Sequence, residues 1–364
     1  MSTDRPVLLA TGGSGGHIYP AIALATGLAQ AGVPVHFTGE SGGPEERLSQ
    51  GHGFPFHGLP AGKLDRQRPN PLALLRASGG VLRAVSLLRR LRPALVIGFG
   101  GFASLPGAAA AALTRTPLWL HEQNSYPGLV TRLLGRRAER VIVTSAAARR
   151  RVRAREFSEV PYPVSELRID RLEARERLGL PPGGLLTLVM GGSQGSVALN
   201  DGVLKALGRL GSAAPLTLHA TGPNNEAAVL ARSLQGDRHF VRGYVDGDLA
   251  FAAADLGVTR AGTGTLAMAA FHGVPLVMVP LPSAAENHQY HNALAVQEAS
   301  AGVLLPQDRL DRLADVWSEV LEPERLETLS AGAMSLSPAG ARDTLVRLVL
   351  RRLHGGTAAH GGEN

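Results

Sequence analysis

Short apolar runs alternate with amphipathic stretches along most of the chain. The apolar runs have the length of buried strands, and the amphipathic stretches, of about 10 to 15 residues, have the length of helices. This alternation predicts strand–helix–strand units on parallel sheets, and so an α/β fold. The strands that we expect span residues 7–10, 33–38, 95–98, 118–121 and 141–144 in the first half, and 185–190, 216–220, 239–241, 256–259 and 276–279 in the second.

The alternation stops between residues 149 and 170, where a basic run precedes Pro161 and Pro163. We interpret this segment as a linker between two doubly wound domains, since a chain of 364 residues favours two domains. Each half has a glycine-rich loop after its first strand. Because ligands of such folds bind beyond the carboxyl ends of the strands, we expect the two domains to face a ligand-binding cleft. The tail, 355–364, has the composition of a disordered segment.

The composition narrows the classes of protein that remain. The chain has no cysteine, which excludes disulfides, thiolate catalysis and thiolate metal sites and favours the cytosol. Its net charge is +7, and Lys63 and Lys205 are the only lysines among 37 basic residues, so we expect an anionic partner. Because only 4% of the residues are aromatic, we expect no nucleic acid. The sequence shows no export signal or spanning segment, so we expect a soluble or peripheral protein.

The first glycine-rich loop, from Gly12 to Gly16, lies between an expected strand and an expected helix. Glycines at such a place let a phosphate reach backbone N–H groups at the positive end of a helix. The loop departs from the dinucleotide fingerprint, because Ile18 stands where a third glycine is needed. His17, at the start of the helix, could accept a proton from an attacking hydroxyl. The alternatives are a tight turn without a ligand and a histidine that caps or packs.

Two loops in the second half offer similar chemistry. Residues 191–196 add a hydroxyl and an amide to a second phosphate-binding backbone. Residues 260–265 follow another expected strand and offer a guanidinium and two hydroxyls to a diphosphate. Either loop could instead be a turn without a ligand. The side chains concerned are Ser193, Gln194, Arg260, Thr263 and Thr265.

Four consecutive polar residues, from His121 to Asn124, follow a buried strand of the first half, and the motif Gly98 to Phe102 follows another. The carboxyl ends of parallel strands meet at one edge of a sheet, so both segments should lie on the same side as His17. We expect Asn124 to bind a sugar by hydrogen bonds and Glu122 to act as an orienting or basic carboxylate. A solvated loop is the alternative.

Two clusters imitate metal sites. Asp246-Gly247-Asp248 resembles a metal-binding D-x-D motif, but it precedes an apolar helical stretch, and we interpret it as a helix N-cap. Glu286, His288 and His291 have a spacing that also fits the polar face of a helix. We therefore predict no metal site and no tightly bound cofactor.

Residues 72–92 form a basic amphipathic stretch that suits an anionic bilayer surface. The alternative is a solvated arginine face over an ordinary buried stripe. The arginines that we expect at the membrane are Arg76, Arg83, Arg89 and Arg90.

Five segments in this order resemble the MurG family, the bacterial N-acetylglucosaminyltransferases that convert lipid I to lipid II in peptidoglycan synthesis. The segments are TGGSGGHIYPAIALA, GFGGFASLPG, HEQNSYPGLVTRLL, MGGSQGSVALN and the region 260–292, and the resemblance runs from about residue 7 to residue 301. It implies a GT-B fold of two doubly wound parallel-sheet domains. The expected boundaries are 1–160 for an acceptor and membrane-facing domain, 161–338 for a nucleotide-sugar donor domain, and 339–354 for a helix that crosses back to the first domain.

The resemblance implies inverting transfer of N-acetylglucosamine from UDP-N-acetylglucosamine to the muramoyl 4-hydroxyl of lipid I, an undecaprenyl-pyrophosphate-linked acceptor. The enzyme would be peripheral, on the cytoplasmic side of the cell membrane. His17 or Glu122 would deprotonate the acceptor hydroxyl, Val245 would hold the uracil through its backbone, and Arg260 would flank the uracil. The other residues that the resemblance assigns to the donor are Ser14, Gly15, Gly16, Asn124, Gly192, Ser193, Gln194, Thr263, Gly264, Thr265, Leu266, His288 and Gln289.

Two expected donor-binding positions depart from the family pattern. Met268 stands where the family has a glutamate that binds the ribose, and methionine cannot accept those hydrogen bonds. Ser165 stands where the family has an arginine. Two alternatives remain open. One is a related GT-B enzyme that glycosylates diacylglycerol or another lipid, which would share the donor loops and the basic surface. The other, suggested by Met268 and Ser165, is a non-catalytic nucleotide-sugar-binding protein.

Overall fold

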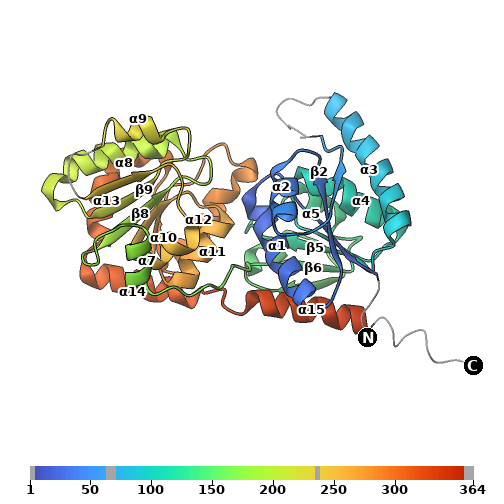
Figure 1. The fold of residues 1–364 in the computed structure, drawn as a ribbon. Helices are drawn as coiled ribbons and strands as arrows, with labels where there is room; N and C mark the ends of the chain where they lie inside the picture. The colour runs from blue at the N-terminus through green and yellow to red at the C-terminus, as the bar shows by residue number, and fades with distance from the viewer. Residues whose placement is uncertain (1–4, 63–70, 234–237, 356–364) are drawn as a thin grey trace, which may run out of the picture. The chain divides into compact units, whose positions relative to one another are not determined.

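The computed structural model describes residues 5–62, 71–233 and 238–355, with side chains described for all of these except residues 71–77 and 285. The chain forms two compact units, shown in Figure 1. Unit 1 comprises Met1–Val164 and Gly340–Asn364, and unit 2 comprises Ser165–Ala339. The tail expected to be disordered lies, from residue 356 on, outside the described residues.

Unit 1 is built on a seven-stranded sheet in the order β3-β2-β1-β4-β5-β6-β7, whose neighbouring strands all pair in parallel. The central strands are buried on both faces, which is why their sequences are continuous apolar runs. The strands are β1 (Val7–Ala10), β2 (Val35–Glu40), β3 (Phe56–Leu59), β4 (Leu95–Gly98), β5 (Leu118–Glu122), β6 (Arg140–Val143) and β7 (Glu156–Glu159).

Helices cover both faces of this sheet. Val7 and Leu9 of β1 pack with α1 and α15 on one face, whereas Leu8 packs with α3 and α4 on the other, because side chains alternate along a strand. The helices of unit 1 are α1 (Gly15–Gln30), α2 (Pro44–Gly51), α3 (Pro71–Leu91), α4 (Leu105–Thr114), α5 (Leu129–Leu134), α6 (Ala146–Arg149) and α15 (Ala341–Gly355), with a 3₁₀ turn, η1 (Phe102–Ser104).

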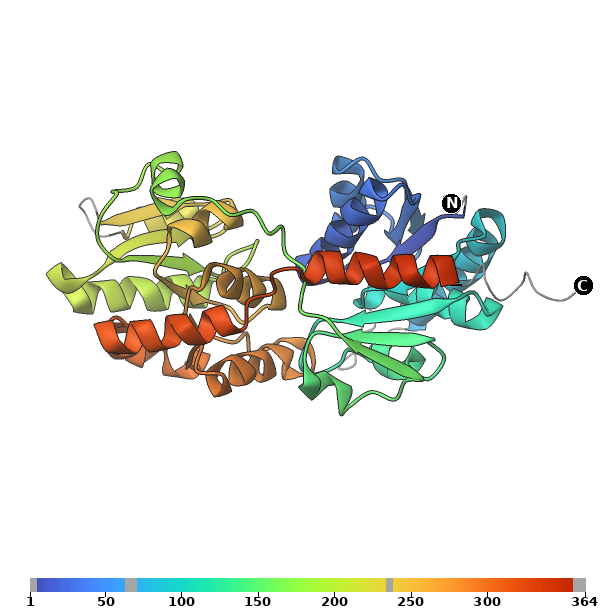
Figure 2. The same ribbon diagram turned by 90° about the horizontal axis from the view of Figure 1, so that it is seen from below.

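The last helix, α15, belongs to unit 1 although it follows unit 2 in the chain, and Figure 2 shows it in red alongside the strands and helices of unit 1. Its apolar side chains Leu345 and Val349 are fully buried in the same cluster as those of α1. A Cβ at Gly27 would lie 2.5 Å from Val346, so only glycine allows the two helices to approach this closely. Arg352 also makes a bidentate ion pair with Glu139, at 2.9 and 3.1 Å.

Unit 2 has a six-stranded parallel sheet in the order β10-β9-β8-β11-β12-β13. The same alternation operates here, with Leu188 of β8 facing α10 and α11 and Val189 facing α8 and α13. The strands are β8 (Leu186–Met190), β9 (Leu216–Ala220), β10 (His239–Arg242), β11 (Leu256–Thr259), β12 (Leu276–Met278) and β13 (Gly302–Leu304). The helices are α7 (Arg171–Arg177), α8 (Val197–Leu210), α9 (Glu226–Leu230), α10 (Gly247–Ala253), α11 (Thr263–His272), α12 (His288–Glu298), α13 (Leu313–Val320) and α14 (Pro323–Ser335), with 3₁₀ turns η2 (Gly211–Ala213), η3 (Ala285–Asn287) and η4 (Gln307–Arg312).

The strands expected from the apolar runs are all present, with ends that move by one or two residues. Three further strands, β3, β7 and β13, were missed, and each lies at the edge of its sheet. The interpretation of residues 149–170 as a linker is therefore wrong for Glu156–Glu159, which form β7. An edge strand has only one paired neighbour and can be polar, so its sequence lacks a buried apolar run.

Candidate active site

In each unit the candidate site lies where the order of the strands reverses. In unit 1 the reversal falls between β1 and β4, so the loop before α1 lies beside the loop after β4. In unit 2 it falls between β8 and β11, which places loop 191–196 beside the turn before α11. Ligands of open parallel sheets bind at such reversals, because the loops there diverge and leave a crevice.

His17 lies in the first turn of α1, where it is half-buried, and the loop after β4 lies against its imidazole. A Cβ at Gly100 would lie 3.3 Å from Nδ1 and Cε1 of His17, and a Cβ at Gly101 would lie 3.1 Å from Cδ2. Both glycines have positive φ, 80° and 75°, which other residues rarely adopt. The motif that contains them, Gly98 to Phe102, therefore brings bare backbone against the histidine ring.

Gln123, the first residue after β5, holds the ring by a hydrogen bond. Its Oε1 lies 3.0 Å from Nδ1 of His17, and its Nε2 donates to the backbone oxygen of Phe99 at 2.8 Å. The side chain is buried, with 2% of its surface exposed. This role of Gln123 is not predicted by the sequence, although Gln123 lies between Glu122 and Asn124, for which the sequence does predict roles. The sequence signal that indicates such a role is the position of Gln123 in the polar segment at the end of β5.

Glu122 stabilises the loop that follows β5. Its Oε1 accepts from the backbone N–H of Asn124 at 3.0 Å and from the side-chain amide of Asn124 at 3.3 Å. Its Oε2 accepts from the backbone N–H of Gly128 at 2.9 Å. Because three donors already engage this buried carboxylate, the geometry favours an orienting role for Glu122 over that of a general base.

The first glycine loop is supported by Glu45, a buried carboxylate on α2 whose role the sequence does not predict. Its Oε2 accepts from the backbone N–H of Gly13 at 3.3 Å, and its Oε1 accepts from that of Glu40 at 2.9 Å. Glu45 therefore occupies one N–H group that a phosphate was expected to reach. In the sequence, a glutamate after Gly-Gly-Pro indicates only the start of a helix.

The second glycine loop leads from β8 into α8. Gly192 and Gly195 have positive φ, 93° and 74°, and Ser196 caps α8 by accepting from the backbone N–H of Leu199 at 3.3 Å. Ser193 and Gln194 are exposed at the tip of the loop. The arrangement presents the positive end of a helix of 14 residues at the reversal point.

Arg260 ties this loop to the rest of unit 2, with 6% of its surface exposed. Its Nη2 donates to Ser196 at 2.6 Å and to Gln307 at 2.7 Å, and its Nη1 donates to the backbone oxygens of Val279 and Pro280 at 3.0 and 3.1 Å. All four acceptors are uncharged, so the guanidinium keeps an uncompensated positive charge among them. Burial lowers the pKa of Arg260 below its usual value.

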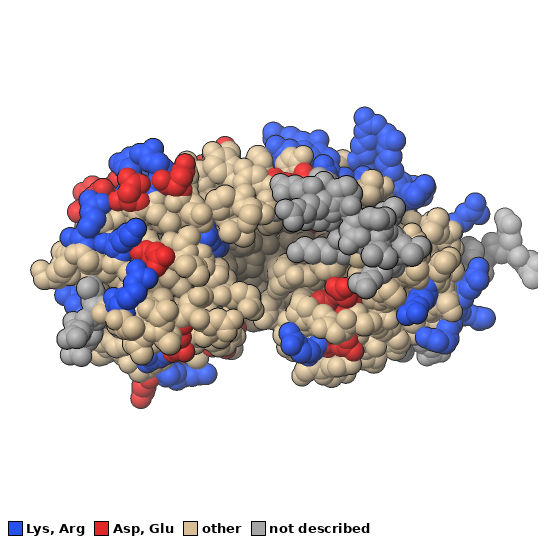
Figure 3. Space-filling view, turned by 90° about the horizontal axis from the view of Figure 1, so that it is seen from above, with Lys and Arg blue, Asp and Glu red and all other residues tan. Residues whose placement is uncertain are grey.

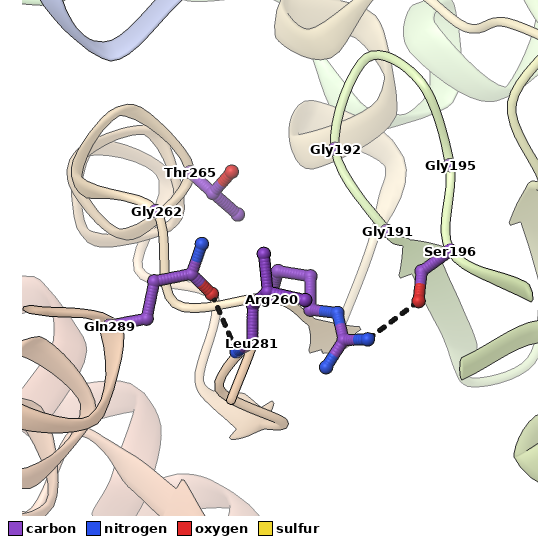
Figure 4. A pocket seen from close by; sticks show the side chains of 9 residues that line it. All are labelled: Gly191, Gly192, Gly195, Ser196, Arg260, Gly262, Thr265, Leu281 and Gln289. Carbon is purple, nitrogen blue, oxygen red and sulfur yellow. Dashed lines mark hydrogen bonds between the residues drawn. The ribbon is translucent and has the colours of Figure 1, made fainter. Parts of the chain in front are cut away.

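A cavity of about 290 Å³ lies at this point of unit 2, and Figure 4 shows the residues that line it. Gln289 accepts from the backbone N–H of Leu281 at 2.9 Å, which turns the amide nitrogen of Gln289 toward Thr265. Four residues that the sequence assigned to the donor therefore meet at one cavity. The lining residues are Gly191, Gly192, Gly195, Ser196, Arg260, Gly262, Thr265, Leu281 and Gln289.

The remaining donor positions lie on neighbouring elements of unit 2. Val245 is buried before α10, and Asp246 caps that helix by accepting from the backbone N–H of Leu249 at 3.1 Å, which confirms the N-cap interpretation. A Cβ at Gly247 would lie 3.0 Å from the terminal methyl of Met268, so Met268 packs beside the segment that contains Val245. Thr263, Gly264 and Leu266 lie in the first turn of α11, and His288 begins α12.

Ser165 stands where the family pattern has an arginine, and its hydroxyl is hydrogen-bonded to a carboxylate. Its hydroxyl donates to Asp248 of α10 at 2.5 Å. Burial raises the pKa of Asp248, and the bond from Ser165 opposes this shift. Within the described residues, no group of three or more His, Asp or Glu side chains is arranged to hold a metal ion.

The two doubly wound parallel sheets, with loops at their reversal points, have the architecture of a GT-B glycosyltransferase, and the comparisons with known proteins assign the chain to that class. Models of the glycosyltransferase family 28 N-terminal and C-terminal domains match residues 7–143 and 186–343. The fold expected from the sequence, two doubly wound parallel-sheet domains of the GT-B type, is confirmed.

Curated relatives and a solved structure identify the family within this class. A UDP-N-acetylglucosamine--N-acetylmuramyl-(pentapeptide) pyrophosphoryl-undecaprenol N-acetylglucosamine transferase from Deinococcus deserti is 44% identical and covers 95% of this chain and 98% of its own length. The Thermus thermophilus transferase of the same name is 42% identical over 94% of this chain and 98% of its own. The crystal structure of Acinetobacter baumannii MurG aligns with a TM-score of 0.78 at 26% identity, over 96% of this chain and all of that one. The chain therefore belongs to the MurG family, as its motifs predicted.

Proposed function

We propose that this enzyme transfers N-acetylglucosamine from UDP-N-acetylglucosamine to the muramoyl 4-hydroxyl of lipid I and so makes lipid II for peptidoglycan synthesis. The observation that carries the proposal is the 44% identity, along nearly the full length of both chains, to a transferase named for these substrates. The sites in the two units supply the chemistry that such a reaction needs.

Unit 2 binds the donor through the cavity at the start of α8. The diphosphate of UDP gains negative charge as the bond to the sugar breaks, and a positive site stabilises that charge. The backbone N–H groups of loop 191–196 and the end of α8 provide direct contacts. Arg260 acts through its charge, because its nitrogens already bond Ser196 and three other oxygens. The free amide N–H of Gln289 donates to a hydroxyl of the sugar.

Unit 1 supplies the base. His17 removes the proton from the acceptor hydroxyl, whose oxygen forms a bond to the anomeric carbon on the face opposite UDP. The bond from that carbon to the diphosphate oxygen breaks at the same time, so UDP leaves and the configuration inverts. Glu122 and Asn124 hold the loop from which Gln123 reaches His17.

Acceptor choice and UDP release test this proposal against its alternatives. Purified enzyme is mixed with UDP-N-acetylglucosamine and either a short-chain lipid I analogue or diacylglycerol, and released UDP is measured. We expect UDP to be released in the mixture that contains the lipid I analogue and not in the mixture that contains diacylglycerol. Release with diacylglycerol instead identifies a different glycolipid transferase. Binding of the donor without release of UDP in either mixture identifies a non-catalytic binding protein and overturns the proposal.

We also propose that unit 1 binds the cytoplasmic face of the membrane, where a lipid-linked acceptor resides. Leu82 on α3 and Leu113 on α4 are 74% and 64% exposed, and these two helices pack together. Arg83, Arg89 and Arg90 on α3 are exposed as well. Leucines among arginines suit an anionic bilayer. Figure 3 shows several groups of basic side chains on the surface of unit 1, at the right of the view.

The remaining arginine expected at the membrane, Arg76, has a side chain outside those that are described. In the described part of the chain, no helix has the length and apolar character needed to span a bilayer.

Cosedimentation with vesicles tests the membrane proposal. The parent should bind vesicles that contain phosphatidylglycerol and dissociate as salt rises, since each engaged arginine contributes about 1 kcal/mol. Replacing Arg83, Arg89 and Arg90 together by glutamine should release the enzyme. A matched control replaces three exposed arginines of unit 2, Arg209, Arg232 and Arg238, by glutamine and should leave binding intact. Binding that survives the first replacement, or that the parent lacks, contradicts the proposal.

A further inference from the structure

The contact between His17 and Gln123 fixes more than the position of the histidine ring. The amide of Gln123 has one end that donates and one that accepts, and Nε2 donates to the backbone oxygen of Phe99 at 2.8 Å. A carbonyl oxygen can only accept, so this bond determines which way the amide points. Oε1 therefore faces Nδ1 of His17, at 3.0 Å.

Because Oε1 of Gln123 can only accept a hydrogen bond, Nδ1 of His17, which faces it, must carry the proton. A neutral imidazole has one N–H group and one lone pair, so a proton on Nδ1 leaves the lone pair on Nε2. We infer that Gln123 is a positioning residue that selects the Nδ1–H tautomer of His17 and so makes Nε2 the atom that accepts the proton. The inference rests on the proposed function for the role of Nε2, but the tautomer itself does not depend on it.

The surroundings of the pair support a positioning role. The backbones of Gly100 and Gly101 lie against the ring, so they restrict its rotation, and Gln123 is buried directly after β5. The side-chain amide of Gln123 holds one orientation, because turning it would set its oxygen against the backbone oxygen of Phe99 and leave both oxygens without a donor.

The proposed step balances with this assignment. The proton of the acceptor hydroxyl moves to Nε2, the hydroxyl oxygen bonds to the anomeric carbon, and the bond to UDP breaks. The resulting imidazolium carries N–H groups on both nitrogens and keeps its bond to Gln123. Glutamine adds no charge, so it orients the ring while favouring the protonated form less than a carboxylate in its place would.

Replacement of Gln123 by methionine removes both ends of the amide at similar length. With the acceptor gone, the ring can take the other tautomer and turn, so we expect kcat to fall by about 10- to 100-fold. The KM for UDP-N-acetylglucosamine should change little, since the donor cavity belongs to unit 2. The control is Gln297→Met, which removes a glutamine that accepts from the backbone N–H of Leu304 on β13, away from His17, and should leave kcat unchanged.

Nitrogen-15 NMR of histidine-labelled enzyme reads the tautomer directly, without substrates. The signals of His17 are assigned by their loss in His17→Ala. At a pH where the ring is neutral, the parent should show a protonated Nδ1 and an unprotonated Nε2, and Gln123→Met should show a mixture. A parent with the proton on Nε2, or a variant with the parental tautomer and reduced kcat, overturns the inference. If the parent transfers no sugar, the proposed function fails while the tautomer result stands.

A second variant keeps the test decisive if Gln123→Met does not fold. In Gln123→Glu a carboxylate faces Nδ1–H and favours the protonated imidazole, so the acidic limb of the pH profile of kcat/KM should move to higher pH by about 1 unit. A residue that merely fills space would leave that limb in place. An unshifted limb in a folded Gln123→Glu enzyme therefore contradicts the positioning role.

Discussion

The second glycine loop allows a sharp test of the donor site, because two of its glycines differ in their surroundings. A Cβ at Gly195 would lie 1.8 Å from the backbone oxygen of Thr221 and 2.8 Å from the Cα of Gly222. At Gly192 a Cβ would meet nothing within 4 Å. Both residues have positive φ, so alanine is strained at either position, but it collides with other atoms only at Gly195.

The expected costs follow from these contacts. Left-handed backbone costs an alanine about 1 to 2 kcal/mol, which is the whole effect at Gly192. Gly195→Ala adds an overpacking cost of about 1 to 3 kcal/mol. Cβ atoms essentially never come closer than 3.0 Å to such a neighbour, so the loop and Thr221 must move apart by about 1.2 Å. A shift of that size displaces the N–H groups that bind the diphosphate, and we expect UDP to bind at least about tenfold more weakly.

Calorimetric titration with UDP and urea unfolding measure the two effects. Trp317 is buried in unit 2 and Trp119 in unit 1, so fluorescence reports the unfolding of unit 2 alone when every variant is made in a Trp119→Phe background. We expect Gly195→Ala to lose UDP affinity and stability together, and Gly192→Ala to lose less of both. Gly179→Ala, another positive-φ glycine with open space around it, serves as a control away from the loop. Parental UDP affinity in Gly195→Ala would refute the assignment of this loop to the diphosphate.

Three further predictions follow from the sites. His17→Ala should lower kcat by about 100-fold or more with little change in the urea midpoint, and near-parental turnover in a kinetic assay removes His17 from the mechanism. Met268→Glu should tighten UDP by about tenfold, because a carboxylate accepts from the ribose hydroxyls, and competition titrations with UDP, GDP and dTDP show whether it does and whether uridine is preferred. Burial lowers the pKa of His121 to about 3, so the folded state resists its protonation, and stability should fall as pH drops from about 6.5 toward 3. The dependence of unfolding free energy on pH should be shallower in His121→Leu, and an equal slope contradicts this account.

The sequence predicts the fold well where strands are buried on both faces. β1 and β4 consist of apolar residues because helices cover each side, so their sequences carry the signal by themselves. β7, with the sequence EFSE, pairs on one side only and has exposed glutamates at both ends. Its strand conformation depends on pairing with β6, which no local pattern reports.

The candidate site likewise has parts that the sequence predicts and parts that only the fold reveals. Glycine loops, His17 and the turn after β11 are visible in the sequence, because their chemistry is local. The bond between His17 and Gln123 joins positions 106 residues apart, so only the fold reveals it. Arg260 shows that the sequence can also suggest a contact that the fold uses differently. Its guanidinium suits a ligand, but it donates to four oxygens of its own unit, including Oε1 of Gln307.

The product of the reaction tests the central claim most directly. Purified enzyme is incubated with UDP-N-acetylglucosamine labelled in the sugar and a short-chain lipid I analogue, and the lipid-linked product is analysed by mass spectrometry and NMR. We expect one labelled N-acetylglucosamine on the muramoyl 4-hydroxyl, with the anomeric configuration inverted, and a matching loss of product with His17→Ala. A labelled sugar at another position, retention of configuration, or no lipid-linked product from a folded enzyme that binds UDP contradicts the account.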